Sequence, residues 1–405
     1  MGCMAKQLDH AQQIAALQER GIRLLAPETI FVGPEVDLHR LAPGVEIHPG
    51  CRLHGSELAI GPGCVLGEEG PATLRDCQLG ARVRIRGGFF DRATLLDHVD
   101  AGSCAHVRPG TLLEEHASFG HGVGLKQTVL FPYVAMGSLI NFCDCLMSGG
   151  TSEANHSEVG SSYVHFNYTP HQDKATPSLV GDVPYGVRLD QPPIFLGGQG
   201  GLVGPCRIAY GSVLAAGQIC RHDILTPGHL VREATAGGEI DRPYDSRIMG
   251  GISRRVTSNL LYIGNLLALD AWWRVVRVRF AREPWQQHGH AGALLRLSEM
   301  LDERIKRLDQ LSAKATLSLQ LAPDSPGCRQ QQAFVAGWPM MREALCAKTA
   351  ARNTIQPSAP VAGILQAIAP DAAYLTWVQS LAPADKQHLT NWLQAMVDAC
   401  GALCA

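Results

Sequence analysis

The 405-residue chain has no long hydrophobic run, no signal-peptide pattern and no excess of either charge. No uninterrupted apolar stretch approaches the roughly 20 residues that a membrane-spanning helix needs, and the N-terminal MGCMAKQLDHAQQ has no apolar core. We therefore expect a soluble, cytoplasmic protein without a membrane partner. Because 35 basic residues face 37 acidic ones, the chain also lacks the basic surplus of a nucleic-acid-binding protein.

The cysteines lack the pattern of a disulfide framework. They number 13, an odd count, and they are scattered, which fits free thiols in a reducing cytoplasm. Cys143 and Cys145 stand two apart, but no second pair lies at a spacing expected for zinc. The sequence therefore predicts no metal site.

A six-residue repeat runs through the first half of the chain. Small or aliphatic residues recur at every sixth position in two runs: Val99, Ala105, Thr111, Ala117, Val123, Val129 and Ala135, then Leu196, Leu202, Ile208, Leu214 and Cys220. This period is neither that of a helix nor that of an alternating strand. Each unit reads as a short strand and a corner, and three units close a coil that must stack on its neighbours. The pattern predicts a left-handed parallel β-helix.

Helical spacing replaces the repeats in the last third. Apolar residues at helical intervals predict helices over 260–282 and 294–311, and further helices after Pro357. A short helix over 8–23 precedes the repeats and caps the first coil. The expected organisation is an N-terminal cap at 1–25, a β-helix at 26–225, a linker at 226–259 and an α-helical domain at 260–405. The fold class is therefore mainly β with an α-helical C-terminal extension.

Two cations stand about one coil apart in the repeats. Arg108 and Lys126 come close in space if a turn of the solenoid takes roughly 18 residues. Two cations that converge on one groove suit a phosphate. The alternative is that each lies in water at a coil corner, as most Lys and Arg do.

A second polar segment follows at residues 161–174. If it is extended, His165 and Asn167 share one face, because side chains alternate along a strand. A His and an Asn together can handle a proton and hold a polar ligand, whereas a single His is often structural. Lys174 adds a third cation downstream.

The order and approximate spacing of these motifs resemble one family over roughly residues 25 to 225. The run Arg108-Pro109-Gly110, Lys126, Asn167-Tyr168, Lys174, Leu196-Gly197-Gly198-Gln199 and Ala215-Ala216-Gly217 is similar to the acetyltransferase domain of bifunctional bacterial N-acetylglucosamine-1-phosphate uridyltransferases. Those enzymes are trimeric left-handed β-helices that transfer an acetyl group from acetyl-CoA to glucosamine 1-phosphate at sites between subunits.

The resemblance implies roles for individual residues of this chain. It implies a homotrimer and acetyl-CoA or another acyl-CoA as cosubstrate. The implied substrate-binding residues are Arg108, Lys126, Asn141, Tyr168 and Lys174, the implied catalytic position is Asn167, and the implied cofactor-binding residues are Ser161, Gly198 and Ala216.

The chain also departs from the family pattern. Ser138 stands where the family has its catalytic histidine, and a serine cannot act as the same base at neutral pH. Asn141 replaces a family tyrosine, and Gly198 replaces a serine on the acetyl-CoA side. Residues 182–193 and extra residues between Gly149 and Ser157 are insertions. No Gly-rich nucleotidyltransferase signature precedes the repeats, so we expect no uridylyl transfer.

Two functional hypotheses follow. The first is an acyl-CoA-dependent N-acyltransferase acting on an amino sugar phosphate or a nucleotide-linked amino sugar, with His165 as the substitute base and a backbone N–H stabilising the oxyanion. The second is a non-catalytic descendant that keeps the sugar-phosphate pocket, which would explain Ser138. A purely structural solenoid would leave the three cations unexplained.

Overall fold

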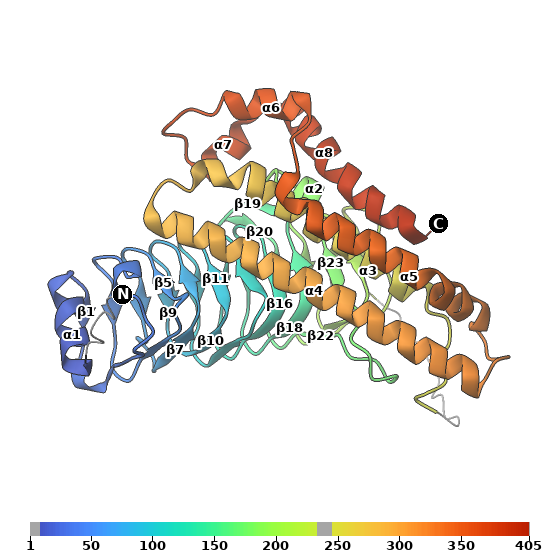
Figure 1. Ribbon diagram of the computed structural model, residues 1–405, viewed down its shortest axis with the longest axis horizontal. Coiled ribbons are helices and arrows are strands. Elements are labelled where there is room, and N and C mark those ends of the chain that lie inside the picture. The colour runs from blue at the N-terminus through green and yellow to red at the C-terminus, as the bar shows by residue number, and fades with distance from the viewer. Residues whose placement is uncertain (1–8, 233–244, 405) are drawn as a thin grey trace, which may run out of the picture.

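The computed structural model describes residues 9–232 and 245–404. It contains a left-handed parallel β-helix of about 11 turns and a C-terminal group of helices (Figure 1), which confirms the predicted fold class. The helices account for 39% of the residues and the short strands for 21%. No helix among the described residues is long and apolar enough to cross a bilayer.

One face of the β-helix is an 11-stranded parallel sheet. Its strands are β1 (Arg23–Leu24), β3 (Glu46–Ile47), β6 (Val65–Leu66), β9 (Arg84–Ile85), β12 (Asp100–Ala101), β15 (Ser118–Phe119), β17 (Ala135–Met136), β21 (Glu158–Val159), β24 (Phe195–Leu196), β27 (Val213–Leu214) and β29 (Leu230–Val231). Because neighbouring strands pair in register, one side chain of each strand points into the coil and the next points out. We call this the first face.

The second and third faces belong to one 16-stranded sheet. The second face contains β2 (Phe31–Val32), β4 (Arg52–His54), β7 (Ala72–Arg75), β10 (Gly88–Asp91), β13 (Ala105–Val107), β22 (Val164–Phe166), β25 (Gly201–Val203) and β28 (Ile219–Cys220). The third contains β5 (Ala59–Ile60), β8 (Gln78–Leu79), β11 (Ala93–Leu95), β14 (Thr111–Leu113), β23 (Ser178–Val180) and β26 (Arg207–Ile208). The longer strands β16 (Gly124–Leu130) and β18 (Asn141–Met147) bend around the corner and join the two faces. An antiparallel hairpin, β19 (Gly150–Ser152) and β20 (Asn155–His156), lies in the insertion predicted after Gly149.

The core of the β-helix consists of the residues that the repeat predicted, except where one coil is shorter by one residue. Both six-residue runs are buried except at Ala135, which is half-exposed. The coil that includes β16 is one residue shorter than a strict repeat, since Ser118 pairs with Ala135, so Val134 and Met136 point inward instead. The period is therefore locally five.

Short helices cap and decorate the β-helix. Helix α1 (His10–Glu19) covers the first coil through buried Leu17, and its N-cap Asp9 forms a capping box with Gln12. The single-turn helices η1 (Pro27–Thr29) and η2 (Leu38–Arg40) follow it, and α2 (Val183–Gly186) lies in the predicted insertion at 182–193.

The C-terminal region is helical, as predicted. It comprises α3 (Ser253–Val275), η3 (Arg277–Phe280), α4 (Pro284–Leu321), α5 (Cys328–Ala350), η4 (Ala351–Thr354), α6 (Ala359–Gln366), α7 (Tyr374–Ser380), α8 (Pro383–Gly401) and η5 (Ala402–Cys404). Helix α4 extends well beyond the predicted 294–311 at both ends and continues to Leu321. It begins at Pro284, the first position after the N-cap Glu283, and Glu283 forms a capping box with Gln286. The expected linker at 226–259 contains β29 and the start of α3, and its residues 233–244 lie outside the described residues.

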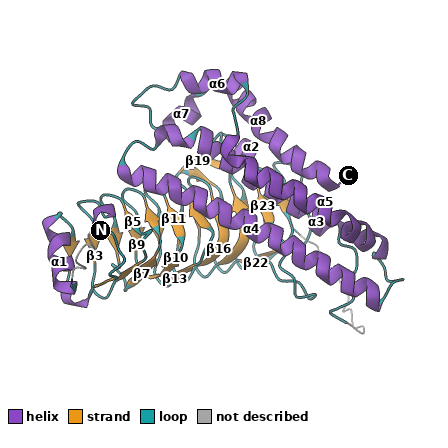
Figure 2. Ribbon diagram, in the orientation of Figure 1, coloured by secondary structure: helices purple, strands orange, loops and turns teal. Residues whose placement is uncertain are grey.

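Helix α4 runs across the strands of the third face (Figure 2). It packs on β5, β8, β11 and β14, and α3 packs between α4 and α8. Its buried side includes Leu297, Leu301 and Leu308, and its Gly292 lies against the buried Gln78 and Thr94 of the third face. The helical region therefore lies beside the β-helix rather than at its end.

Candidate functional site

The corner where the second and third faces meet brings three sequence-predicted cations together. Arg108, Lys126 and Cys143 lie in register on successive coils, because Lys126 pairs with Cys143 and the Arg108 N–H donates to the Leu125 carbonyl oxygen at 2.9 Å. The Arg108 Nη2 also donates to the Cys143 sulfur at 3.2 Å. The repeat spacing thus placed Arg108 and Lys126 correctly.

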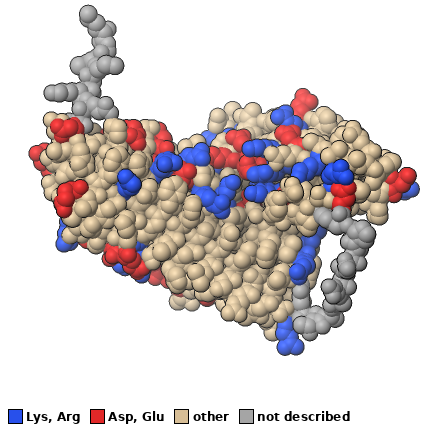
Figure 3. Space-filling model, turned by 90° about the horizontal axis from the view of Figure 1, so that it is seen from below, with Lys and Arg blue, Asp and Glu red and all other residues tan. Residues whose placement is uncertain are grey.

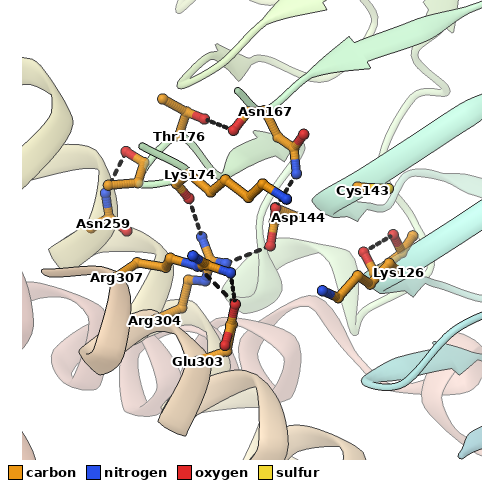
Figure 4. Close-up of polar contacts among 12 residues, drawn as sticks. Lys126, Cys143, Asp144, Asn167, Lys174, Thr176, Asn259, Glu303, Arg304 and Arg307 are labelled. Carbon is orange, nitrogen blue, oxygen red and sulfur yellow. Dashed lines mark hydrogen bonds and ion pairs between the residues drawn. The ribbon is translucent and has the colours of Figure 1, made fainter. Parts of the chain in front are cut away.

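Lys174 reaches the same corner from a loop that follows β22. Figure 4 shows the Lys126 and Lys174 side chains extending into the space beside Cys143 and Asp144. Burial raises the pKa of the Cys143 thiol to about 11, although the positive charges of Arg108, Lys126 and Lys174 act to lower it. The thiol is therefore neutral at physiological pH, and all three cations are close enough to act on it.

Few negatively charged groups among the described residues pair with these three cations. No ion pair joins Arg108, Lys126 or Lys174 to a carboxylate there, and the Lys174 ammonium lies 6.0 Å from the centre of the Tyr168 ring. The carboxylate of Asp144 is close by but is used otherwise, since it accepts hydrogen bonds from Asn167 and from Arg304 of α4. A local excess of positive charge at one corner is the condition for binding an anion.

Helices α3 and α4 hold the loop that carries Lys174. The buried Arg304 pairs with Asp144, and its Nη1 donates to the Lys174 carbonyl oxygen at 3.4 Å. From α3, the Asn259 Nδ2 donates to the Ala175 carbonyl oxygen at 2.9 Å. The sequence analysis did not identify Asp144 or Arg304. No motif indicates Arg304, because this residue lies on α4, 160 positions along the chain from Asp144, and the two meet only in the folded protein.

Two clefts flank the corner. The first, of about 430 Å³, lies on the second face and is lined by His106, Arg108 and Asn141. His106, Gly124 and Asn141 stand in register, and Gly124 has no side chain to fill the space between the other two. The second, of about 620 Å³, lies between the corner and α4 and is lined by His106, Arg108, Lys126 and three charged residues of α4.

The structure contradicts the expected role of His165. Its side chain points into the coil and is 2% exposed, whereas those of its neighbours Val164 and Phe166 are less buried, and β22 ends at Phe166, before Asn167. Its Nδ1 lies 2.5 Å from the Cys143 carbonyl oxygen, and its Nε2 lies 2.7 Å from the Ser178 Oγ. Burial lowers the pKa of His165, so the ring is neutral. We therefore withdraw His165 as the substitute base and assign it a structural role.

The predicted acyl-CoA residues form a separate column at the corner between the first and second faces. The Ser138 N–H donates to the Ser161 Oγ at 3.0 Å, and the Gly217 N–H donates to the Gly198 carbonyl oxygen at 2.9 Å, so the positions Ser138, Ser161, Gly198 and Ala216 follow one another up successive coils. A Cβ added at Gly198 would lie 2.9 Å from the Ser161 carbonyl oxygen, which favours glycine there.

None of these four positions lines the clefts described beside Arg108, although Leu139, which follows Ser138, lines the first of them. Ser138 lines a third cleft, of about 390 Å³, together with Ser118 and His121. The structure thus groups Arg108, Lys126, Asn141, Asn167 and Lys174 around one corner and the acyl-CoA positions around another. The exposed Tyr168 lies over Lys174.

Comparisons with known proteins point to one kind of relative. No protein-family model matches the chain. The chain is 29% identical over 205 residues to the bifunctional protein GlmU of Pelobacter propionicus, covering 50% of this chain and 39% of that protein. It is 35% identical over 152 residues to the bifunctional protein GlmU of Thermus thermophilus, covering 37% of this chain and 30% of that protein. The matched part is their acetyltransferase domain. The chain spans about two fifths of the length of the curated relatives it matches.

Proposed function

We propose that the protein is an N-acetyltransferase of the β-helix type that acts on a phosphorylated amino sugar, with acetyl-CoA as donor. The similarity to the acetyltransferase domain of GlmU proteins supports an acetyltransferase-like function. Three cations, Arg108, Lys126 and Lys174, lie at one corner, and none forms an ion pair with a carboxylate among the described residues. This observation is the reason for choosing a phosphorylated acceptor. A doubly charged phosphate would balance them.

The neighbouring polar side chains would hold the sugar. Asn141 lies in the cleft beside Arg108, and Asn167 is held in place through Asp144. Tyr168 is exposed next to Lys174 and offers an aromatic face to the ring. The phosphate would therefore sit at the corner, and the sugar would extend from it along one of the two clefts.

The acyl-CoA would lie along the column at the other edge of the second face. Ser161, Gly198 and Ala216 follow the coils in order, and the glycine at 198 lets the backbone of Ser161 approach closely. A backbone N–H is the kind of donor that stabilises the oxyanion of an acyl-transfer intermediate.

With His165 withdrawn and Ser138 unable to act as base, His106 is our candidate proton acceptor. It projects outward from β13 and lines both clefts that contain Arg108. In the reaction the amine nitrogen attacks the thioester carbonyl carbon, the C–N bond forms, the C–S bond breaks, and the leaving thiolate takes up a proton. The imidazole would remove the surplus proton from the attacking nitrogen.

A homotrimer is part of this proposal. Helix α4 covers the third face, so the first and second faces remain for contacts between subunits. A neighbour packed there would bring its own residues to the edge of the second face, where the acyl-CoA column lies.

A non-catalytic binding protein is the second candidate. It is favoured by Ser138 at the position of the family histidine and by the burial of His165, because both remove the expected bases while the cations remain. In this candidate the corner binds a phosphorylated sugar or sugar nucleotide, and the helical region serves another purpose.

One experiment tests both candidates. The purified protein is titrated calorimetrically with glucosamine 1-phosphate and is separately incubated with acetyl-CoA and the same sugar while release of free CoA thiol is followed. Saturable binding together with sugar-dependent thiol release supports the transferase. Binding without thiol release supports the binding protein, and the absence of binding contradicts both.

A further inference from the structure

We infer that helix α4 forms the second wall of the phosphate cleft and that Glu303 on this helix recognises the ammonium group of the bound ligand. The inference rests on the acceptor named in the proposed function and gives a residue that sets binding specificity for it. It concerns the bound ligand before acyl transfer, because the acyl-CoA column lies at the other edge of the second face. Nothing in the repeat region pointed to this residue, because it comes from the helical extension.

The two walls of the cleft differ in net charge. The β-helix side is lined by three cations and one carboxylate, Arg92, Arg108, Lys126 and Asp91, and the α4 side by two carboxylates and one cation, Glu299, Glu303 and Lys306. Its volume of about 620 Å³ can accommodate a sugar phosphate. Figure 3 shows basic and acidic side chains gathered side by side in one band across the molecule, whereas much of the surface beside the band carries no charge.

Of the three carboxylates, Glu303 is the one that we assign to a ligand. Asp91 lies on the β-helix side, where its Oδ1 is 3.7 Å from the Arg92 Nε. Glu299 is committed to the packing of α4, since its Oε2 lies 3.5 Å from the Arg296 Nη1 and burial raises its pKa. Glu303 uses one oxygen, Oε1, which accepts a hydrogen bond from the Arg307 Nε at 2.7 Å. Among the described residues its Oε2 has no hydrogen-bond partner.

The arrangement also holds Glu303 in position. Arg307 pairs with it from one helical turn further along, and the neighbouring Arg304 is fixed by Asp144 of β18. Figure 4 shows Glu303 on the α4 side of the same space into which Lys126 extends. The carboxylate therefore stands across the cleft from the cations, on a helix that is anchored to the corner itself.

A ligand that fits both walls carries a negative group at one end and a positive group at the other. An amino sugar phosphate meets this condition, because its phosphate matches Arg108 and Lys126 and its ammonium matches Glu303. A sugar phosphate with a hydroxyl in place of the amine keeps the first contact and loses the charge of the second. Since charge-assisted hydrogen bonds are about twice as strong as neutral ones, Glu303 should discriminate between the two ligands.

The test compares two isosteric ligands on matched variants. Dissociation constants of glucosamine 1-phosphate and glucose 1-phosphate are measured by calorimetry at pH 7 for the wild type and for Glu303→Gln. We expect the wild type to prefer the amino sugar by about tenfold, which corresponds to about 1.4 kcal/mol, and the variant to lose most of this preference. The comparison uses the ratio, because removing a negative charge will strengthen phosphate binding in general.

Two control variants separate recognition from a structural effect. Asp302→Asn makes the same change at an exposed neighbouring carboxylate of α4 and should leave the preference intact. Arg307→Gln breaks the ion pair but keeps the Glu303 carboxylate, so the preference should persist.

Three results would overturn the inference. The first is a wild type that binds both ligands equally, which would leave the phosphate site and the proposed function standing. The second is Arg307→Gln abolishing the preference as completely as Glu303→Gln does, because the ion pair would then be what matters. The third is a wild type that binds neither ligand, which would overturn the proposed function as well.

Discussion

Three cations on successive coils and a neighbouring loop stand at the centre of the proposed site. All three are partly exposed and form no ion pair among the described residues, so replacing one should change the stability of the fold little. The same cations would contribute strongly to binding an anion, because none of them forms an ion pair with a carboxylate among the described residues.

Replacing either Arg108 or Lys126 by Ala should therefore weaken binding of glucosamine 1-phosphate by about tenfold or more, corresponding to at least about 1.4 kcal/mol, without lowering the melting temperature. Calorimetric titration and thermal unfolding check the two parts. Arg329→Ala, at an exposed position of α5, is the matched control. Unchanged affinity in both variants would mean that the two side chains are merely solvated.

The two histidines near the corner should respond in opposite ways. His106→Ala should lower turnover by roughly 10²-fold with little change in melting temperature, as expected for a general base. His165→Ala should instead destabilise the fold by about 1–3 kcal/mol, because it removes a hydrogen-bond partner of the Cys143 carbonyl and one of the two partners of the Ser178 hydroxyl. Turnover per folded molecule and thermal unfolding separate the two effects. Loss of turnover at full stability in the His165 variant would restore His165 as the base.

Helix α4 is the element that joins the helical region to the site. Its buried Arg304 pairs with Asp144 of β18 and bonds the loop that carries Lys174. A buried pair of this kind costs most when one partner is removed, because the remaining charge is left without compensation.

Arg304→Met should therefore lower the free energy of unfolding by about 3–5 kcal/mol and weaken ligand binding through the loosened loop. Arg279→Met, at an exposed position of η3, should do neither. Denaturant unfolding and calorimetry provide the measurements. If the Arg304 variant keeps wild-type affinity, the helical region does not support the site.

A second contact between helices and β-helix should make stability depend on pH. Burial raises the pKa of Glu114 to about 8, and its Oε1 accepts a hydrogen bond from the Trp273 indole of α3 at 3.1 Å. The folded protein keeps this proton up to about pH 8, whereas the unfolded chain loses it near the ordinary value of about 4.3. The stabilisation is therefore fully present below the unfolded value and is lost as pH rises toward the folded one.

Glu114→Gln should remove this dependence. The variant should melt about 2 °C or more above the wild type at pH 9, and the difference should shrink at pH 5. Thermal scans across this range test the expectation. A constant difference between the two proteins would show that the Glu114 carboxyl does not titrate in this window.

At the scale of the molecule, the arrangement leaves two faces of the β-helix for neighbours. Phe195, Val213 and Leu230 stand in register on the last coils of the first face, and all three are exposed. Three apolar side chains in a row form a surface that another copy of the chain would cover.

We expect a trimer of about 130 kDa, three times the 43.5 kDa chain, by light scattering at micromolar concentration. Val213→Glu should shift the population toward smaller species, because the charge would be buried in the contact. A wild-type monomer would exclude a site shared between subunits.

The sequence by itself determined the β-helix and the proximity of Arg108 and Lys126 at one corner. A six-residue repeat leaves few other ways to bury the aliphatic positions, and the same repeat places Arg108 beside Lys126 one coil apart. The helical character of the last third likewise followed from apolar spacing alone.

Only the tertiary structure decided the direction of His165 and the place of α4. Strand alternation predicts a shared face for His165 and Asn167, but β22 ends between them, and where a strand ends depends on the turn and on the neighbouring coil. Glu303 and Arg304 lie at the corner because α4 packs against the β-helix, although the two are far apart in the chain. Apolar spacing sets which side of α4 is buried, but the strands against which that side packs depend on the fit between whole surfaces.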